Sequence, residues 1–490
     1  MMKPRSPLLY QINTRAWLRE LTGKLGRPAT LDDIPDHEWE EFAKAGFDWI
    51  WLLGVWQTGA AGQRVSRENP EWRHEYEATL PDLTDEDIPG SCFAITGYQV
   101  HEKLGGDAAL ARLRERMRRH GLRLLLDFVP NHMAPDHPWI SQHPDYFVSG
   151  TEEQLANEPQ NYIRVITPTG TRVMAYGRDP YFSGWPDTLQ LNYGNAGLRE
   201  AMTQTLLRLA GMCDGVRCDM AMLILPEVFE RTWHIAMPPF WPDAIARVKE
   251  KSPDFLFMAE VYWDLEWTLQ QQGFDSTYDK RLYDRLREQH AIPVRNHFRA
   301  GLDFQDKLAR FLENHDEPRA AATFAPEVHA AAAVLTFFSP GLRFFHQGQF
   351  EGRRLRLSPH LNRWPVEPVN DRTVGFYHRV LDVLCDPVFR DGDWQLLEAS
   401  SAWAGNWTDD NFIVFHWSGP NAQHRLVTVN YSPHQSQCHV RLPFVQRLGK
   451  TIRLRDWMSE ASYDRLDQEL ADPGLYLDLP AWGYHVFELR

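Results

Sequence analysis

Short apolar runs that alternate with amphipathic stretches constrain the fold of this 490-residue chain more than any other feature. Between the runs lie segments such as 107–121 and 198–211, where apolar residues recur at steps of three and four and predict helices. Eight runs predict strands, and they cover residues 8–13, 48–55, 122–129, 214–219, 255–261, 273–279, 309–314 and 342–347. Strands separated by helices pair in parallel, so the pattern favours an α/β fold built on a closed (β/α)8 TIM barrel. A doubly wound open sheet is the alternative, but residues 9–17 lack its glycine-rich phosphate turn.

The spacing of the third and fourth strand ends indicates an inserted segment. Asp127 and Asp219 lie 92 residues apart, whereas one barrel repeat takes about 30 residues. The intervening segment is rich in His, Pro, Gly and Asn, and we predict a small domain inserted there after strand three. After residue 390 the pattern alternates in twos between turn residues, which predicts a C-terminal antiparallel β-sandwich. The predicted domains are two barrel parts, 1–132 and 186–389, the inserted domain 133–185 and the sandwich 390–490.

Charge and composition exclude several classes of partner. The formal net charge of −14 argues against nucleic acid and anionic membranes, because neither is attracted to a net acidic surface. Nineteen Trp and sixteen Tyr suit a cleft that binds a neutral sugar, since their rings are flat and amphipathic. Five cysteines without CxxC spacing suggest neither a disulfide framework nor a zinc cluster, and no apolar run has the length of a membrane span. We therefore expect a cytoplasmic protein, of unknown oligomeric state.

The stretch CDGVRCDMA, residues 213–221, places two charges inside an otherwise apolar predicted strand. Alternate residues of a strand share a face, so Arg217 and Asp219 point the same way. A buried unpaired charge is too costly to keep, so the pair is either a structural ion pair or part of a cavity where the carboxylate is reactive. The strand alone leaves both interpretations open.

Two further acidic residues follow predicted barrel strands and bear on that choice. Glu260 comes 41 residues after Asp219, and Asp316 comes 56 residues after Glu260, which are about one and two barrel repeats. Strand ends of a barrel converge on one mouth, so we expect the three carboxylates to gather there. Paired carboxylates cleave glycosidic bonds, one ionised to attack and one protonated to give the leaving oxygen its proton. We expect Arg217 to lower the pKa of Asp219, and Glu260, which faces two carboxylates, to keep its proton.

Four short stretches resemble the ordered sequence signatures of the alpha-amylase family, glycoside hydrolase family 13. They are DFVPNH (127–132), GVRCDMA (215–221), AEVYW (259–263) and ENHDEP (313–318), each at the end of a predicted strand. The resemblance implies Asp219 as nucleophile, Glu260 as general acid/base and Asp316 as the residue that stabilises the transition state. It also implies four sugar-binding residues and two supporting residues, namely Tyr98, on which the sugar ring would stack, with His132, Arg217 and His315, and then Asp127 and Asn131.

The same resemblance implies a reaction. A retaining enzyme of this type cleaves or transfers the α-glucosidic bonds of malto-oligosaccharides or related α-glucosides through a covalent glycosyl-enzyme intermediate. Alternatives on the same fold are a transglycosylase, a sucrose- or trehalose-acting enzyme and a sugar phosphorylase. A non-catalytic amylase-like binding protein is a further alternative, but such relatives usually lack an acidic residue and carry a membrane anchor, whereas this chain has all three carboxylates.

The expected chemistry requires no cofactor, and we predict no metal ligands. In many members of the family the asparagine that corresponds to Asn131 helps to bind a structural calcium ion. Calcium prefers several carboxylate and carbonyl oxygens, and no acidic cluster in residues 133–185 compels such a site. A structural calcium ion is therefore compatible with the sequence but is not predicted from it.

Overall fold

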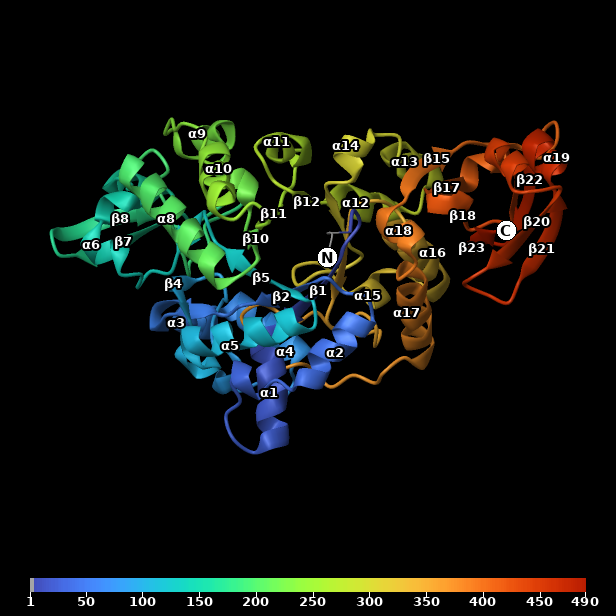
Figure 1. The fold of residues 1–490 in the computed structure, drawn as a ribbon. Helices are drawn as coiled ribbons and strands as arrows, with labels where there is room; N and C mark the ends of the chain where they lie inside the picture. The colour runs from blue at the N-terminus through green and yellow to red at the C-terminus, as the bar shows by residue number, and fades with distance from the viewer. Residues whose placement is uncertain (1–3) are drawn as a thin grey trace.

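A computed structural model describes residues 4–490 and contains a closed barrel of eight parallel strands (Figure 1). The strands are β1 (Leu8–Asn13), β2 (Trp49–Leu53), β5 (Arg123–Phe128), β10 (Gly215–Cys218), β11 (Leu256–Ala259), β12 (Ser276–Tyr278), β13 (Leu308–Arg310) and β14 (Leu342–His346). Each strand pairs in parallel with the next along the chain, and β14 closes the ring on β1. The eight predicted strands and the closed barrel are thereby confirmed.

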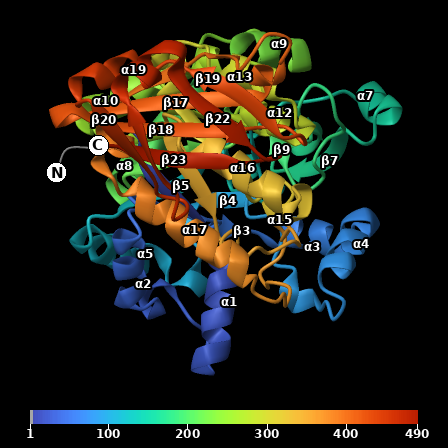
Figure 2. The same ribbon diagram turned by 90° about the vertical axis from the view of Figure 1, so that its right-hand side faces the viewer.

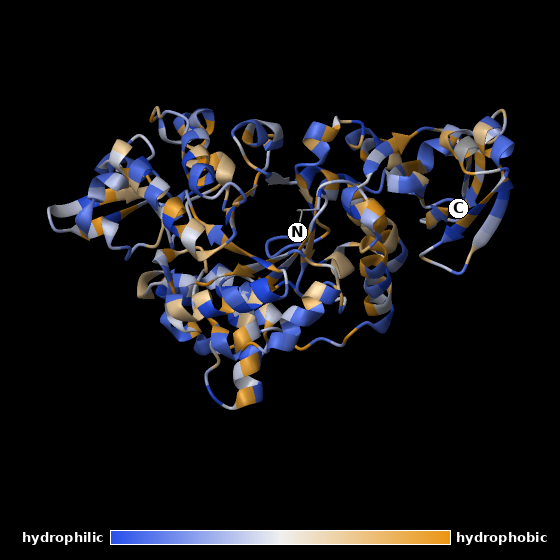
Figure 3. Ribbon diagram, viewed as in Figure 1, coloured by the Kyte–Doolittle hydropathy of each residue, from blue (hydrophilic) through white to orange (hydrophobic). Residues whose placement is uncertain are grey.

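Amphipathic helices surround the barrel (Figure 1). The larger ones are α1 (Thr14–Leu25), α2 (Asp36–Lys44), α5 (Gly106–Arg119), α8 (Ala196–Met212), α10 (Trp241–Lys251), α11 (Glu266–Gln271), α12 (Lys280–Glu288), α13 (Ala291–His297), α16 (Pro326–Phe337) and α17 (Asp371–Leu384). In α5 the buried residues Ala109, Leu110, Leu113 and Met117 follow the helical period, so one face packs inward while the arginines stay outside. Hydrophobic and hydrophilic residues accordingly alternate around the outer helices (Figure 3). No helix within residues 4–490 is long and apolar enough to cross a membrane.

Two excursions leave the barrel before the chain reaches β10. The second was expected from the spacing of the strand ends, and it contains β6 (His132–Met133), α6 (Trp139–Gln142), α7 (Glu152–Asn157), β7 (Tyr162–Thr167), β8 (Gly170–Ala175) and β9 (Leu189–Gln190). Its two ends are joined, because β6 pairs with β9. The first was not predicted, and it contains β3 (Trp56–Thr58), α3 (Ala60–Glu68), α4 (Pro70–Thr79) and β4 (Ile95–Val100). Its helices are short and contain few large apolar residues, so little in the sequence marked them.

The C-terminal part consists of two antiparallel sheets, as predicted for a β-sandwich (Figure 2). The larger sheet has the order β15-β17-β18-β23-β20-β21 and the smaller one β16-β19-β22. Their strands are β15 (Asp393–Leu397), β16 (Ala399–Ser401), β17 (Phe412–Gly419), β18 (Gln423–Asn430), β19 (Ser436–Val440), β20 (Thr451–Asp456), β21 (Ser462–Leu466), β22 (Leu475–Leu479) and β23 (Tyr484–Leu489). Alternate residues of these strands, such as Ile452 and Leu454, fill a separate hydrophobic core.

The sandwich is joined to the barrel by buried contacts. Trp417 of β17 packs in the same hydrophobic core as the barrel residues, and its indole Nε1 donates a hydrogen bond to the Phe338 carbonyl oxygen at 2.8 Å. The Tyr431 hydroxyl donates to the carbonyl oxygen of Leu286 in α12 at 2.7 Å. The barrel and the larger sheet therefore share one core.

We predict that Trp417→Ala lowers the free energy of unfolding by about 3–5 kcal/mol, because it removes a buried indole and leaves the Phe338 carbonyl without its partner. Urea unfolding followed by circular dichroism measures the loss. The control is Trp403→Ala, whose side chain is 55% exposed and whose loss should cost less than about 0.5 kcal/mol. Equal effects of the two substitutions would contradict the shared core.

Candidate active site

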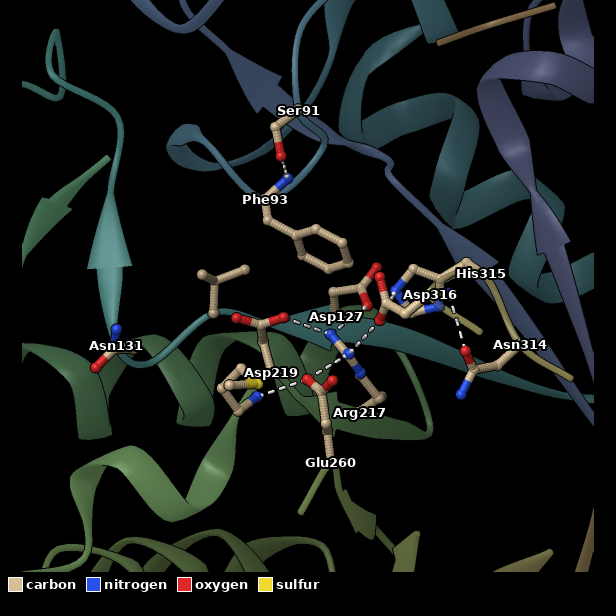
Figure 4. Close-up of polar contacts among 12 residues, drawn as sticks. Ser91, Phe93, Asp127, Asn131, Arg217, Asp219, Glu260, Asn314, His315 and Asp316 are labelled. Carbon is tan, nitrogen blue, oxygen red and sulfur yellow. Dashed lines mark hydrogen bonds and ion pairs between the residues drawn. The ribbon is translucent and has the colours of Figure 1, made fainter. Parts of the chain in front are cut away.

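The carboxyl ends of neighbouring barrel strands bring the predicted acidic residues together (Figure 4). Asp219 directly follows β10 and Glu260 directly follows β11, while Asp316 lies in the loop after β13. Backbone hydrogen bonds fix the first two positions, since Asp219 N donates to Phe128 O at 2.8 Å and Glu260 N donates to Cys218 O at 3.0 Å. Asp219, Glu260 and Asp316 all line one cavity of about 280 Å³.

Arg217 lies at the centre of these carboxylates and is fully buried. Its Nη1 is 2.7 Å from Asp219 Oδ1, and its Nη2 is 2.5 Å from Glu260 Oε2. Asp127 Oδ1 and Asp316 Oδ2 are more distant, at 3.8 and 3.9 Å from the same guanidinium. The charged pair that the sequence placed inside a strand is thus an ion pair, and its carboxylate is also part of a cavity wall.

Glu260 is held in a defined orientation by three donors. Its Oε2 accepts from Arg217 and from the backbone N–H of Met220 at 2.7 Å, and its Oε1 accepts from the Tyr262 hydroxyl at 2.8 Å. Burial raises the pKa of Glu260 to about 7, against the attraction of Arg217, and the negative charges of Asp219 and Asp316 add to the rise. A large fraction of this carboxyl group is therefore protonated at neutral pH, as the sequence led us to expect.

Arg217 lowers the pKa of Asp219 as expected, but the net shift of that pKa is upward. Burial raises the pKa of Asp219 above its ordinary value, although Arg217 opposes the rise and forms a hydrogen bond with it. Asp219 is almost completely buried, and the desolvation of its charge outweighs one shared cation. Because Arg217 also contacts Glu260, it does not by itself assign different protonation states to the two carboxyl groups.

Asp316 differs from the other two in being partly open to the cavity, with 36% of its side chain exposed. Burial of the group would raise its pKa, but His315, whose Nε2 is 3.0 Å from Asp316 Oδ2, and Arg217 together hold that pKa below its usual range. His315 is itself fixed by Gln11, whose Nε2 donates to its Nδ1 at 2.8 Å. Asp316 therefore stays ionised and faces the space where a ligand would bind.

The remaining predicted residues surround this centre. His132, in β6, lines the cavity, and burial lowers its pKa to about 3, so its ring is neutral at neutral pH. Asp127 is buried beneath the site, where its Oδ2 accepts from the backbone N–H of Gly54 at 3.3 Å. Asn131 is buried beside His132 and does not line the cavity. These positions suit one ligand contact and two supporting roles.

The surroundings of Asn131 do not fit a cation. The side-chain nitrogen of Gln190 donates to Asn131 Oδ1 at 2.9 Å, to the Asn131 carbonyl oxygen at 3.0 Å and to the Leu191 carbonyl oxygen at 3.1 Å. An N–H donor thus stands among three oxygens that would otherwise suit calcium. Across residues 4–490, no group of three or more His, Cys, Asp or Glu side chains is arranged to hold a metal ion.

Tyr98, expected to stack on the sugar, does not line the cavity. Its ring packs between Trp56 and Phe128 in the interior, and its hydroxyl donates to the Val129 carbonyl oxygen at 2.9 Å. Phe93, five residues earlier, takes the expected place, with its ring 5.1 Å from the guanidinium of Arg217 (Figure 4). The family resemblance implied Tyr98, and a ring with one polar edge suits both stacking and packing; here that edge binds the backbone.

Several cavity residues were not found from the sequence. They are Trp72, Phe93, Trp185, Asp187, Tyr262 and His360. Tyr262 lies two residues after Glu260 in the same signature, and that nearness was a usable signal. The others come from the two excursions and from the loop after β14, whose approach to the site depends on long-range packing.

Comparison with known proteins agrees with this architecture. The model of the alpha-amylase catalytic domain matches residues 93–354, which is more than half of the chain. The alpha-amylase MalA of Haloarcula japonica is 28% identical over 286 residues, which are 56% of this chain and 38% of that protein. An alpha-1,4-glucan:maltose-1-phosphate maltosyltransferase of Burkholderia pseudomallei is 26% identical over 299 residues, 57% of this chain and 22% of that enzyme. The matches thus span well under half the length of these two relatives.

Among solved structures, a maltogenic alpha-amylase, AmyB, of Thermotoga neapolitana superposes with a TM-score of 0.71. The two chains are 17% identical, and the superposition covers 99% of each, which shows a common fold. The closed barrel has the four signatures at its strand ends. Together with the match to the catalytic-domain model, this shows that the chain belongs to the alpha-amylase family.

Proposed function

We propose that the protein is a retaining glycosidase that hydrolyses or transfers α-glucosidic bonds. The observation that carries the proposal is the pair Asp219 and Glu260, bound to the two nitrogens of one guanidinium and lining one cavity. Carboxyl groups bridged in this way are close together, which favours direct attack on the sugar over activation of a water molecule between them. The pKa of Glu260, raised to about 7, suits a group that must donate a proton and later accept one.

Each residue has a distinct role in the proposed reaction. The Asp219 carboxylate attacks the anomeric carbon, the glycosidic bond breaks, and the departing oxygen takes the proton of Glu260. The glucosyl ester on Asp219 is then attacked by water or by a sugar hydroxyl, whose proton passes to Glu260 while Asp219 is released as a carboxylate. Asp316 stays ionised throughout and accepts hydrogen bonds from sugar hydroxyls.

The substrate class is an α-glucan or α-glucoside. The names of the relatives support it, since one is an alpha-amylase and the other a maltosyltransferase that acts on an α-1,4-glucan. Those names also cover both hydrolysis and transfer, so transglycosylation, action on sucrose or trehalose, and phosphorolysis are the alternatives. Product analysis with and without phosphate and an acceptor sugar separates them. A non-catalytic binding role is disfavoured by the presence of all three carboxylates in the cavity.

We further propose a cytoplasmic enzyme that needs no metal. None of the five cysteines is in a disulfide, which suits a reducing compartment. The amide of Gln190 supports metal independence, because it joins the inserted excursion to Asn131 with hydrogen bonds alone.

The first prediction concerns the nucleophile. Asp219→Asn should lower turnover of an aryl α-glucoside by roughly 10⁴-fold or more, because no other group can form the ester. Asp219→Gly vacates the attacking face, so azide should restore turnover of this second variant, and the product should be the β-glucosyl azide. The control is Asp478→Asn, on the C-terminal sheet, which should keep full activity. Unchanged activity of Asp219→Asn, measured by release of the aryl group, would exclude this mechanism.

The second prediction concerns pH. Glu260 must be protonated to act as an acid, so kcat/KM should fall as the pH rises through about 7, by about tenfold per unit above it. Glu260→Gln should abolish that alkaline limb for an aryl glucoside whose leaving group needs no proton. A pH profile of the variant that keeps the same limb would show that another group is the acid.

The third prediction concerns metal. Treatment with EDTA should shift the melting temperature by less than about 1 °C, because the Gln190 side chain already donates hydrogen bonds to the oxygens of Asn131. Gln190→Asp exchanges the donor for a carboxylate, and we expect this variant to melt at a lower temperature in EDTA and to regain stability when calcium is added. Scanning calorimetry measures both. A drop in wild-type melting temperature with EDTA would contradict the metal-free arrangement.

A further inference from the structure

The first excursion and the loop after β14 form a compact unit next to the active site. We call residues 60–90 and 355–364 together the cap. Tyr76, Leu80 and Ile88 from the first segment share a small hydrophobic core with Leu357, Leu361 and Trp364 from the second. This core is separate from that of the barrel, and it joins two segments that are far apart in the sequence.

Polar contacts fix the two segments of the cap to each other. Arg363 forms ion pairs with Asp87 at 2.8 Å and with Asp82 at 3.0 Å. Ser66 Oγ lies 2.8 Å from His360 Nδ1 in a hydrogen bond. The Asp87 carboxylate is almost inaccessible to water, so the loss of Arg363 would leave a buried charge without its partner. The cap is therefore a fixed wall and not a loose loop.

The cap reaches into the cavity of the catalytic carboxylates. Trp72 and His360, whose ring centroids are 4.6 Å apart, line it together with Pro359. At about 280 Å³ the cavity is at the small end of ligand sites, which run from roughly 300 to 1,000 Å³. An extended oligosaccharide needs an open groove, and this wall interrupts it.

The cap approaches the carboxyl groups from the side of Phe93 and Asp316. Ser91 and Phe93, which follow the first cap segment, line the cavity, and Phe93 lies over Arg217. The positive charge of Arg356, in the second cap segment, acts on Asp316. Glu260, which protonates the leaving oxygen, is instead held by Met220 and Tyr262.

Asp187 adds a polar group to the same cavity. Its carboxyl group is almost completely buried and lines the cavity, and no cation within residues 4–490 forms an ion pair with it. Burial raises its pKa to about 7. A carboxyl group without an ion pair, in a cavity that Trp72 and Trp185 also line, suits the hydroxyls of one sugar ring.

We propose that the cap closes the glycone side of the site, so that the enzyme binds one terminal glucosyl unit and acts on short α-glucosides from the non-reducing end. Every sugar of an α-1,4-glucan except the last carries another sugar on O4. A wall behind the bound ring therefore admits only the sugar at the non-reducing end. The inference rests on the proposed glycosidase function and narrows its substrates.

The test compares substrates that differ at the non-reducing end. They are maltoheptaose, the same oligosaccharide blocked there by a 4,6-O-ethylidene group, β-cyclodextrin, which has no end, and an aryl α-glucoside. For the wild-type enzyme we expect glucose as the first product from maltoheptaose and turnover of the aryl glucoside. The blocked and cyclic substrates should be cleaved at no more than about one hundredth of the rate on maltoheptaose. Time courses by ion chromatography measure all four.

A variant removes part of the wall. Trp72→Ala should raise the rate on the blocked substrate relative to maltoheptaose by about tenfold, because it opens space behind the first ring. The matched control is Trp267→Ala, a tryptophan that is 45% exposed and lines a different cavity, and its ratio should not change. Circular dichroism reports whether each variant folds. If Trp72→Ala does not fold, the comparison of the four substrates with the wild-type enzyme still tests the proposal.

The possible results distinguish a failure of the capped site from a failure of the glycosidase function. Equal rates on blocked and free oligosaccharides, or maltose as the first product, would overturn the capped site while leaving the glycosidase function intact. Failure to cleave any of the four substrates, the aryl glucoside included, would overturn the proposed function and this inference with it.

Discussion

One buried guanidinium organises the site. Arg217 is enclosed by the carboxyl groups of Asp127, Asp219, Glu260 and Asp316, and a single positive charge cannot balance four negative ones in a space with little water. Burial raises the pKa values of Asp127, Asp219 and Glu260, and the charges of neighbouring carboxylates add to the rise for Asp219 and Glu260. A shared proton that moves easily among close carboxyl groups is what acid and base catalysis at one site requires.

The chemistry of the site and its shape come from different parts of the chain. The acidic residues stand at the ends of barrel strands, whose positions follow from the hydrogen-bonded ladder. The aromatic walls, Trp72 and Trp185, stand on the two excursions. Strand ends are held rigidly, whereas excursions tolerate change in length and sequence, so substrate range can vary while the reaction is kept.

Much of the barrel and the clustering of its carboxylates could be predicted because both follow from local patterns. Apolar runs mark strands, and parallel strands deliver their ends to one mouth, which is enough to bring Asp219, Glu260 and Asp316 together. The sequence could not predict that Phe93, and not Tyr98, lines the cavity, because this depends on which ring turns inward near the start of a strand. The pKa of Asp219 depends on depth of burial, and the cap depends on contacts between residues about 280 positions apart, such as Asp82 and Arg363.

The short ladder between β6 and β9 has a consequence for how this enzyme could diversify. It ties the departing and returning chain of the second excursion together at its base, with His132 opposite Gln190 and Met133 opposite Leu189. Residues at the exposed tip of the excursion can change in length or sequence without moving His132. That tip is the turn between β7 and β8 with the start of β8, residues 168–171, because Val173, Met174 and Ala175 of β8 already pack in the main core.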